Sequence, residues 1–164
     1  MKKKLGMLVA MFALFNTSAL ADSFGVRLGY PLGVQYTSGE SFRISGYVNP
    51  FYGLGIGIQG DLILGSIKGL ANTEALNLYY GAGANAGYYT YSFGNVYSYS
   101  YLNLGVQGTG WIEYTLTPTI SVFVDASVGI DYGISLGSTG ALGGTTFGGI
   151  APYYGGALGL NFKL

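Results

Sequence analysis

The sequence has 164 residues, of which 9% are charged and 16% aromatic, and it contains 30 glycines but neither histidine nor cysteine. Ordinary soluble domains carry about 25% charged residues, so this chain has too few charges to solvate the surface of a soluble fold. The absence of histidine and cysteine excludes Ser-His and Cys-His nucleophiles and the usual zinc and copper ligands. We therefore expect a protein that is not an enzyme, with no catalytic residues, no cofactor and no metal site.

The first 21 residues have the three parts of a secretory signal peptide. Residues 2–4 are lysines, residues 5–15 are almost entirely apolar, and residues 19–21 form an A-x-A cleavage site. The apolar run is shorter than the roughly 20 residues that a membrane-spanning helix needs. We therefore predict export with cleavage after Ala21, which leaves residues 22–164 as one domain. That domain has four basic and seven acidic residues and no basic patch, so we expect no nucleic-acid partner.

Alternating apolar and polar residues predict β-strands over most of the mature chain. In residues 120–134 every even position is apolar, and the odd positions are small or acidic apart from Phe123. A period of two is typical of a strand with one apolar and one polar face. The same pattern predicts strands at residues 24–36, 41–48, 51–64, 75–88, 101–114, 120–134 and 150–164.

The connections between these strands follow from turn residues and glycine content. In chain order we expect a tight turn at 37–40, a turn at Asn49-Pro50, a loop at 65–74, a hairpin tip at 89–100 with its turn at Gly94-Asn95, a short turn at 116–119 and a flexible loop at 135–149. This gives seven clear strands, whereas bacterial single-chain barrels have even numbers from eight upward. We expect eight, in which case one of the seven hides a turn, and the candidate positions are Tyr30-Pro31 and the Asn49-Pro50 region. The alternative is a barrel with an unusual strand number.

Every charge within the strands lies opposite the apolar face of its own strand. A barrel in lipid must turn such charges inward, because a lipid-facing Arg or Lys at the midplane costs about 2–4 kcal/mol. The alternative is a soluble barrel with its apolar face inside, whose outer face would carry far fewer charges than the usual 25–35% or so. We therefore predict an all-β fold, a closed antiparallel up-and-down transmembrane β-barrel. The inward charges are Arg27, Arg43, Asp61, Glu113, Asp125, Asp131 and Lys163.

Seven charges inside a narrow barrel must be paired, because an isolated charge is costly in a low-dielectric interior. We expect them to form one cross-strand network, joined by the amides of Asn77, Asn85, Asn103 and Gln107. An eight-stranded barrel is just wide enough for its side chains to fill it. The inward glycines would leave room for large neighbours such as Tyr79, Trp111 or Phe123. The alternative is that these glycines line a narrow pore or a cavity for a small ligand.

Three features together resemble the small bacterial outer-membrane β-barrels of the OmpA-domain and OmpX type. They are the Tyr- and Gly-rich hairpins, the turn YTLTPT at residues 114–119 and the final alternating strand LGLNFKL. The resemblance implies a last strand that is read by the outer-membrane insertion machinery, although Phe162 stands two residues before the usual terminal position. It also implies that the turn at 116–119 faces the periplasm and that residues 89–100 and 135–149 are extracellular.

The resulting functional hypothesis is a monomeric, non-enzymatic protein of the bacterial outer membrane, in contact with its lipid. Its role would be structural, or would be surface contact through the extracellular loops. Tyrosine supplies contact area at low entropic cost, so the aromatic tip is the candidate contact loop. The alternative function is a narrow pore or small-ligand carrier that uses the glycine-lined interior. The candidate contact residues are Tyr89, Tyr91, Phe93, Tyr97 and Tyr99.

Overall fold

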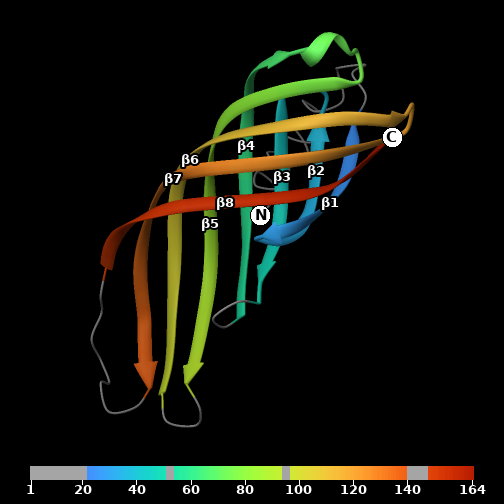
Figure 1. The fold of residues 1–164 in the computed structure, drawn as a ribbon. Coiled ribbons are helices and arrows are strands. Elements are labelled where there is room, and N and C mark those ends of the chain that lie inside the picture. The colour runs from blue at the N-terminus through green and yellow to red at the C-terminus, as the bar shows by residue number, and fades with distance from the viewer. Residues whose placement is uncertain (1–21, 51–53, 94–96, 140–147) are drawn as a thin grey trace, which may run out of the picture.

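Eight antiparallel β-strands form one sheet that closes on itself. The computed structural model describes residues 22–50, 54–93, 97–139 and 148–164, with the side chains of residues 92–93, 97 and 137–139 left out. The predicted signal peptide, residues 1–21, lies outside the described residues. The strands are β1 (Ser23–Tyr30), β2 (Leu32–Ser38), β3 (Phe42–Asn49), β4 (Leu54–Ile67), β5 (Leu76–Phe93), β6 (Tyr97–Thr117), β7 (Ile120–Thr139) and β8 (Gly148–Lys163) (Figure 1).

Each strand pairs with the next in sequence, and β8 pairs with β1, so the sheet makes a complete ring. The register at the closure places Phe24 beside Phe162 and Arg27 beside Gly159. A short 3-10 turn, η1 (Leu70–Asn72), lies between β4 and β5. The prediction of an all-β fold with eight antiparallel strands is confirmed.

The strand that the sequence pattern does not resolve begins after Tyr30. Residues 24–36 are predicted as one strand, but the chain reverses there and Val26 of β1 lies opposite Val34 of β2. Pro31 lies between the two strands, and the peptide bond before it is cis. Proline has no N–H to donate to a ladder. The first of the two expected positions for the missing turn is therefore correct.

Residues 89–93 and 97–100 of the predicted hairpin tip form the paired ends of β5 and β6, which extend past the predicted strand limits at 88 and 101 to Phe93 and Tyr97. Tyrosine has a high strand propensity, and aromatic pairs across neighbouring strands stabilise a sheet. The expected turn at Gly94-Asn95 lies outside the described residues. Similarly, β7 continues to Thr139 into the predicted loop at 135–149.

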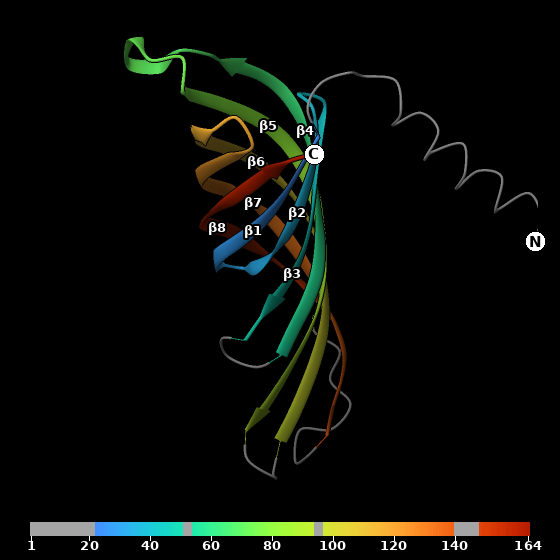
Figure 2. The same ribbon diagram turned by 90° about the vertical axis from the view of Figure 1, so that its right-hand side faces the viewer.

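The two ends of the ring differ in height. The short turns after β2 and β6 lie at one end, the turn end, where Leu164 also donates a backbone hydrogen bond to Asp22. The opposite end, the loop end, contains the hairpin at Pro31 and the far ends of β5, β6 and β7. These three strands have 18, 21 and 20 residues, whereas β1 and β2 have 8 and 7. The long strands therefore reach beyond the others as a tall wall at the loop end (Figures 1 and 2).

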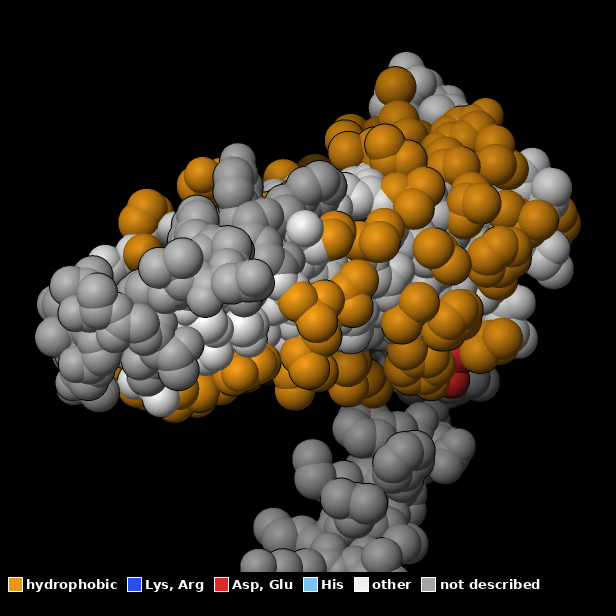
Figure 3. Space-filling model, turned by 90° about the horizontal axis from the view of Figure 1, so that it is seen from below, with side chains coloured by type: hydrophobic (Ala, Val, Ile, Leu, Met, Phe, Trp, Pro, Cys, Tyr) orange, Lys and Arg blue, Asp and Glu red, His pale blue; other side chains and the backbone are white. Residues whose placement is uncertain are grey.

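Burial is the reverse of that in a soluble domain, where charged side chains are outside and large apolar ones inside. Ile58, Leu64 and Val128 point outward and are 64%, 66% and 68% exposed, while Arg43 and Gln59 are 0% and 1% exposed. Figure 3 shows hydrophobic side chains gathered over the outer face, with very few charged ones in view. The core inside the ring is therefore polar.

Among the described residues, no helix is long and apolar enough to cross a membrane.

Candidate functional site

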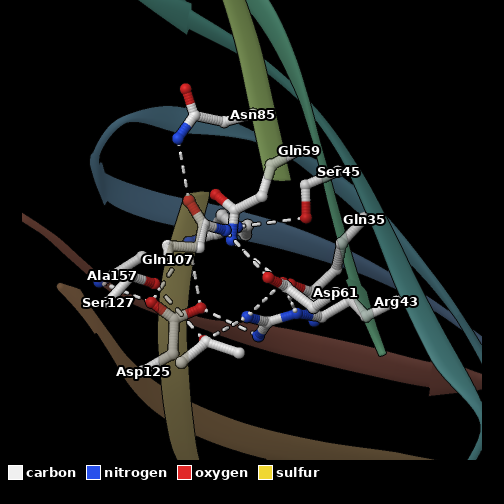
Figure 4. Close-up of polar contacts among 12 residues, drawn as sticks. Gln35, Arg43, Ser45, Gln59, Asp61, Asn85, Gln107, Asp125, Ser127 and Ala157 are labelled. Carbon is white, nitrogen blue, oxygen red and sulfur yellow. Dashed lines mark hydrogen bonds and ion pairs between the residues drawn. The ribbon is translucent and has the colours of Figure 1, made fainter. Parts of the chain in front are cut away.

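Two arginines and two aspartates form the centre of the interior, which we call the charge cluster: Arg27, Arg43, Asp61 and Asp125. Arg43 on β3 lies between both acids, with Nη2 at 3.0 Å from Asp61 Oδ2 and Nη1 at 3.1 Å from Asp125 Oδ2 (Figure 4). Nη2 of Arg27 on β1 lies 3.0 Å from the same oxygen of Asp125. All four side chains are at most 2% exposed. Two charges of each sign leave the cluster neutral.

Neutral groups add hydrogen bonds to the charge cluster, as a buried ion pair requires, and among the cluster atoms only Nε of Arg27 is buried without a partner in the described residues. These neutral groups come from four different strands, β3, β4, β6 and β8, so the cluster ties the ring together across its centre. The partners are Ser45 for Arg27, Thr109 for Arg43, Gln59 and Gln107 for Asp61, and the backbone N–H of Ala157 for Asp125.

Aromatic rings pack toward the turn end of the charge cluster. The guanidinium carbon of Arg43 lies 4.3 Å from the centre of the Trp111 ring, a distance at which cation–π attraction operates. Tyr79 stacks on Trp111, with the two ring centres 5.1 Å apart and an angle of 15° between the ring planes. Phe123 is 2% exposed and lies over Gly159, where a side chain would collide with its ring. Large side chains thus occupy space that inward glycines leave.

The other three predicted interior charges do not join the cluster by ion pairs. Asp131 is linked to it through amides, because Asn85 donates to Asp131 and to Gln107, which donates in turn to Asp61. Six residues along a strand separate Asp131 from Asp125, which is about 20 Å. Asp131 therefore joins the expected cross-strand network through the amides of Asn85 and Gln107 and not through an ion pair.

The remaining two charges lie at the turn end. Glu113 accepts hydrogen bonds from Ser121 and Asn161. Lys163 makes no ion pair with any described residue. Asn77, expected in the network, accepts a hydrogen bond from the backbone of Gly69 instead.

A cavity of about 240 Å³ opens at the loop end, inside the tall wall. Tyr89 of β5 and Tyr101 of β6 form one side of it, with rings stacked 5.0 Å apart at 9°. Tyr47 and Tyr153 line it from β3 and β8. Asp131 also lines this space, which we call the loop-end cavity.

Three of the five predicted contact residues, Tyr89, Tyr91 and Tyr99, lie on the inner face of the tall wall. Tyr91 continues the aromatic stack, 5.8 Å from the ring of Tyr101, and Tyr99 lies 5.9 Å from it. The side chains of Phe93 and Tyr97 lie outside the described part of the structure. Tyr101, which ends the predicted aromatic tip but is not one of the five candidate contact residues, belongs to the same surface. Its odd position, shared with the inward Asn103 on the same strand, is the signal that could have found it.

A second cavity of about 140 Å³ lies at the turn end, lined by Trp111, Glu113 and Lys163 among others. No residue lines both cavities. The charge cluster and its amide partners occupy the middle of the ring between them. Within the described ranges, no three acidic side chains are close enough to hold a metal ion.

Comparison with known proteins gives no match to a family model, a curated protein or a solved structure. The class of this protein therefore rests on its own features: a ring of eight antiparallel strands, a polar ion-paired interior and an apolar outer face.

Proposed function

We propose that this protein is a non-enzymatic β-barrel of the bacterial outer membrane, similar in kind to the OmpA-domain and OmpX type. The reversed burial carries this proposal. An apolar outer face is stable in contact with hydrocarbon. In water, the same face would lose about 25 cal/mol of stabilisation for each Å² of apolar surface that stays exposed. A closed ring also pairs its backbone groups without a free edge, as a sheet in lipid must.

The outward face has the height that a bilayer requires. On β5 the outward positions run from Leu76 to Tyr88 without a charge. Twelve residues cover about 40 Å along a strand, or about 30 Å across a membrane at the usual tilt. The hydrocarbon core of a bilayer is about 30 Å thick.

Aromatic side chains lie outward near both margins of this band. Phe24, Tyr114 and Phe162 lie toward the turn end, and Tyr88 and Tyr132 toward the loop end, all between 40% and 49% exposed. Tyrosine at the two margins is typical of the girdles of membrane barrels. In this proposal the turn end faces the periplasm and the loop end faces outward. Residues 1–21 direct export, and the insertion machinery reads β8.

A charge placed in the middle of the outer face should destabilise the protein in lipid. We expect Val128→Arg on β7 to lower the free energy of unfolding in lipid vesicles by about 2–4 kcal/mol, because Val128 would face the bilayer midplane. Ile67→Arg at the end of β4 is the matched control, with an expected loss of about 0–1 kcal/mol. Urea titration of the refolded variants measures both. Equal, small losses would contradict a lipid-facing surface.

The role that fits this interior is structural or contact-forming rather than conducting. The charge cluster lies between the two cavities, so we expect no steady single-channel openings in a planar bilayer. The alternative, a narrow pore, predicts openings that change with Arg43→Gln. Lys68→Gln is the control, since it removes a positive charge from a side chain that is 64% exposed. Steady openings that respond only to Arg43→Gln would replace the present proposal with the pore.

The tall wall is the surface available for contact with other molecules. It presents the stacked rings of Tyr89, Tyr91 and Tyr101 beside the low rim formed by β1 and β2. Stacked tyrosines offer a large, rigid contact area at little entropic cost. This supports a contact role through the inner face of the wall rather than through an outward tip.

A further inference from the structure

We propose that the loop-end cavity binds a small organic cation with a primary ammonium group. Asp131 is the counter-ion, Asn103 supplies a further acceptor, and tyrosine rings form the walls. The site is built by side chains of the folded ring, so this inference goes beyond the proposed membrane role and does not depend on it.

The carboxylate of Asp131 is held in place by two amides. Nδ2 of Asn85 donates to Oδ1 at 3.1 Å, and Nδ2 of Asn103 donates to Oδ2 at 2.6 Å. Gly105 leaves the space for this carboxylate, because a side chain at that position would collide with Asp131. Two neutral donors orient the carboxylate but do not neutralise its charge.

The chain offers no basic residue that could neutralise Asp131 at this end. Residues 28–39, 44–60, 75–112 and 126–162 include the whole loop-end half of the ring, and they contain one charged residue, Asp131 itself. This covers every connection at the loop end, so no arginine or lysine there supplies the missing charge. A half-buried carboxylate without a counter-ion is costly, and a bound cation would remove that cost.

The two nearest arginines along the strands, Arg27 and Arg43, are already paired with the acids of the charge cluster. Their charges are balanced by Asp61 and Asp125. A cation for Asp131 must therefore come from outside the chain.

Beside the uncompensated charge of Asp131 lies a hydrogen-bond acceptor that has no partner. Asn103 is 5% exposed, and within the described residues its Oδ1 accepts no hydrogen bond. Reversing the amide would not help, because Oδ1 would then face the Asp131 carboxylate, which accepts but cannot donate. The side chain lines the same cavity. A free acceptor next to a free negative charge requires a ligand that donates hydrogen bonds, which selects an ammonium over a quaternary amine.

The walls of the cavity suit a cation with a short apolar body. Tyr47, Tyr89, Tyr101 and Tyr153 line it, and the faces of aromatic rings attract cations. Its volume of about 240 Å³ holds about eight waters at about 30 Å³ each. The ligand is therefore small, of the size of a short alkylamine.

The test is a titration of the protein refolded in detergent micelles, followed by NMR of the side-chain amides of Asn85 and Asn103. The probes are n-butylammonium, 1-butanol, tetramethylammonium and sodium, each alone. We expect saturable shifts with n-butylammonium, and binding at least about tenfold weaker for the other three. Absence of saturation with n-butylammonium would overturn the proposal. So would equal binding of 1-butanol or sodium. Equal binding of tetramethylammonium would overturn the hydrogen-bonding role of Asn103.

Two variants, each replacing an acidic side chain by its amide, test whether the ligand binds at Asp131. Asp131→Asn should weaken n-butylammonium binding by about tenfold or more, whereas Glu113→Gln at the turn end should leave it unchanged. Equal effects of the two variants would show a general response to net charge and would refute the site. The comparison among the four probes uses the unmodified protein, so it decides the question even where Asp131→Asn does not fold.

Discussion

Replacing Asp125 by asparagine should lower the free energy of unfolding by about 3–5 kcal/mol, the cost of leaving buried charges without a partner. Asp125 is the one acid in the charge cluster that contacts both arginines, at 3.0 Å from Arg27 and 3.1 Å from Arg43. Its second oxygen accepts the backbone N–H of Ala157 on β8. An asparagine amide would direct N–H groups at donors that already carry positive charge.

The loss is measured as the urea midpoint and slope of the refolded protein. Glu113→Gln is the matched control, because the partners of Glu113 are the hydroxyl of Ser121 and the amide of Asn161 rather than an arginine. We expect this control to lose about 1 kcal/mol, the value of an ordinary hydrogen bond. Equal midpoints for the two variants would show that the charge cluster contributes no more than neutral contacts do.

The period of two predicts most of the fold, because each strand has one outward apolar face whatever its neighbours are. It also predicts that Arg43 and Asp61 point inward, since both stand at odd positions. The pairing of these two residues depends on the stagger of β3 against β4, which places them directly opposite each other. Stagger depends on two strands together, so the alternation pattern of a single strand does not predict it.

The hairpin at Pro31 shows why a strand boundary can escape this pattern. The connection between β1 and β2 is a single residue, so the even positions stay outward on both sides of it. Tyr30 and Leu32 therefore continue one alternation although the chain reverses between them. Only the missing N–H of Pro31 indicates the break.

The site at the loop end could be predicted only in part. Asp131 and the tyrosines at odd positions are inward by their period, but their gathering around one cavity requires five strands to meet at one height. The unusual length of β5, β6 and β7 could not be predicted either. The tyrosine-rich ends of β5 and β6 fit a hairpin tip equally well, and the end of β7, residues 135–139, has the composition of a flexible loop. Tyrosine is both a strand residue and a common surface residue, so composition alone does not separate the two.

A methyl group at Gly159 should destabilise the ring at its closure. Gly159 of β8 lies opposite Arg27 of β1 and beside Phe123 of β7. A side chain there would collide with the carbonyl oxygen of Val26 and with the ring of Phe123. The first obstacle is backbone and the second is a ring that is 2% exposed, so neither can move aside cheaply.

We expect Gly159→Ala to lower the free energy of unfolding by about 3 kcal/mol, the upper part of the range for overpacking. Gly60→Ala on β4 is the matched control, since no atom lies within 4 Å of the added carbon. Removing a glycine where there is space reduces the entropy of the unfolded chain, so this control should be neutral or more stable by about 0.4–1 kcal/mol. Urea midpoints compare the two, and equal destabilisation would refute the steric argument. A loss of stability in Gly159→Ala together with a gain in Gly60→Ala would show that the closure of β8 against β1 depends on the space that Gly159 leaves for the ring of Phe123.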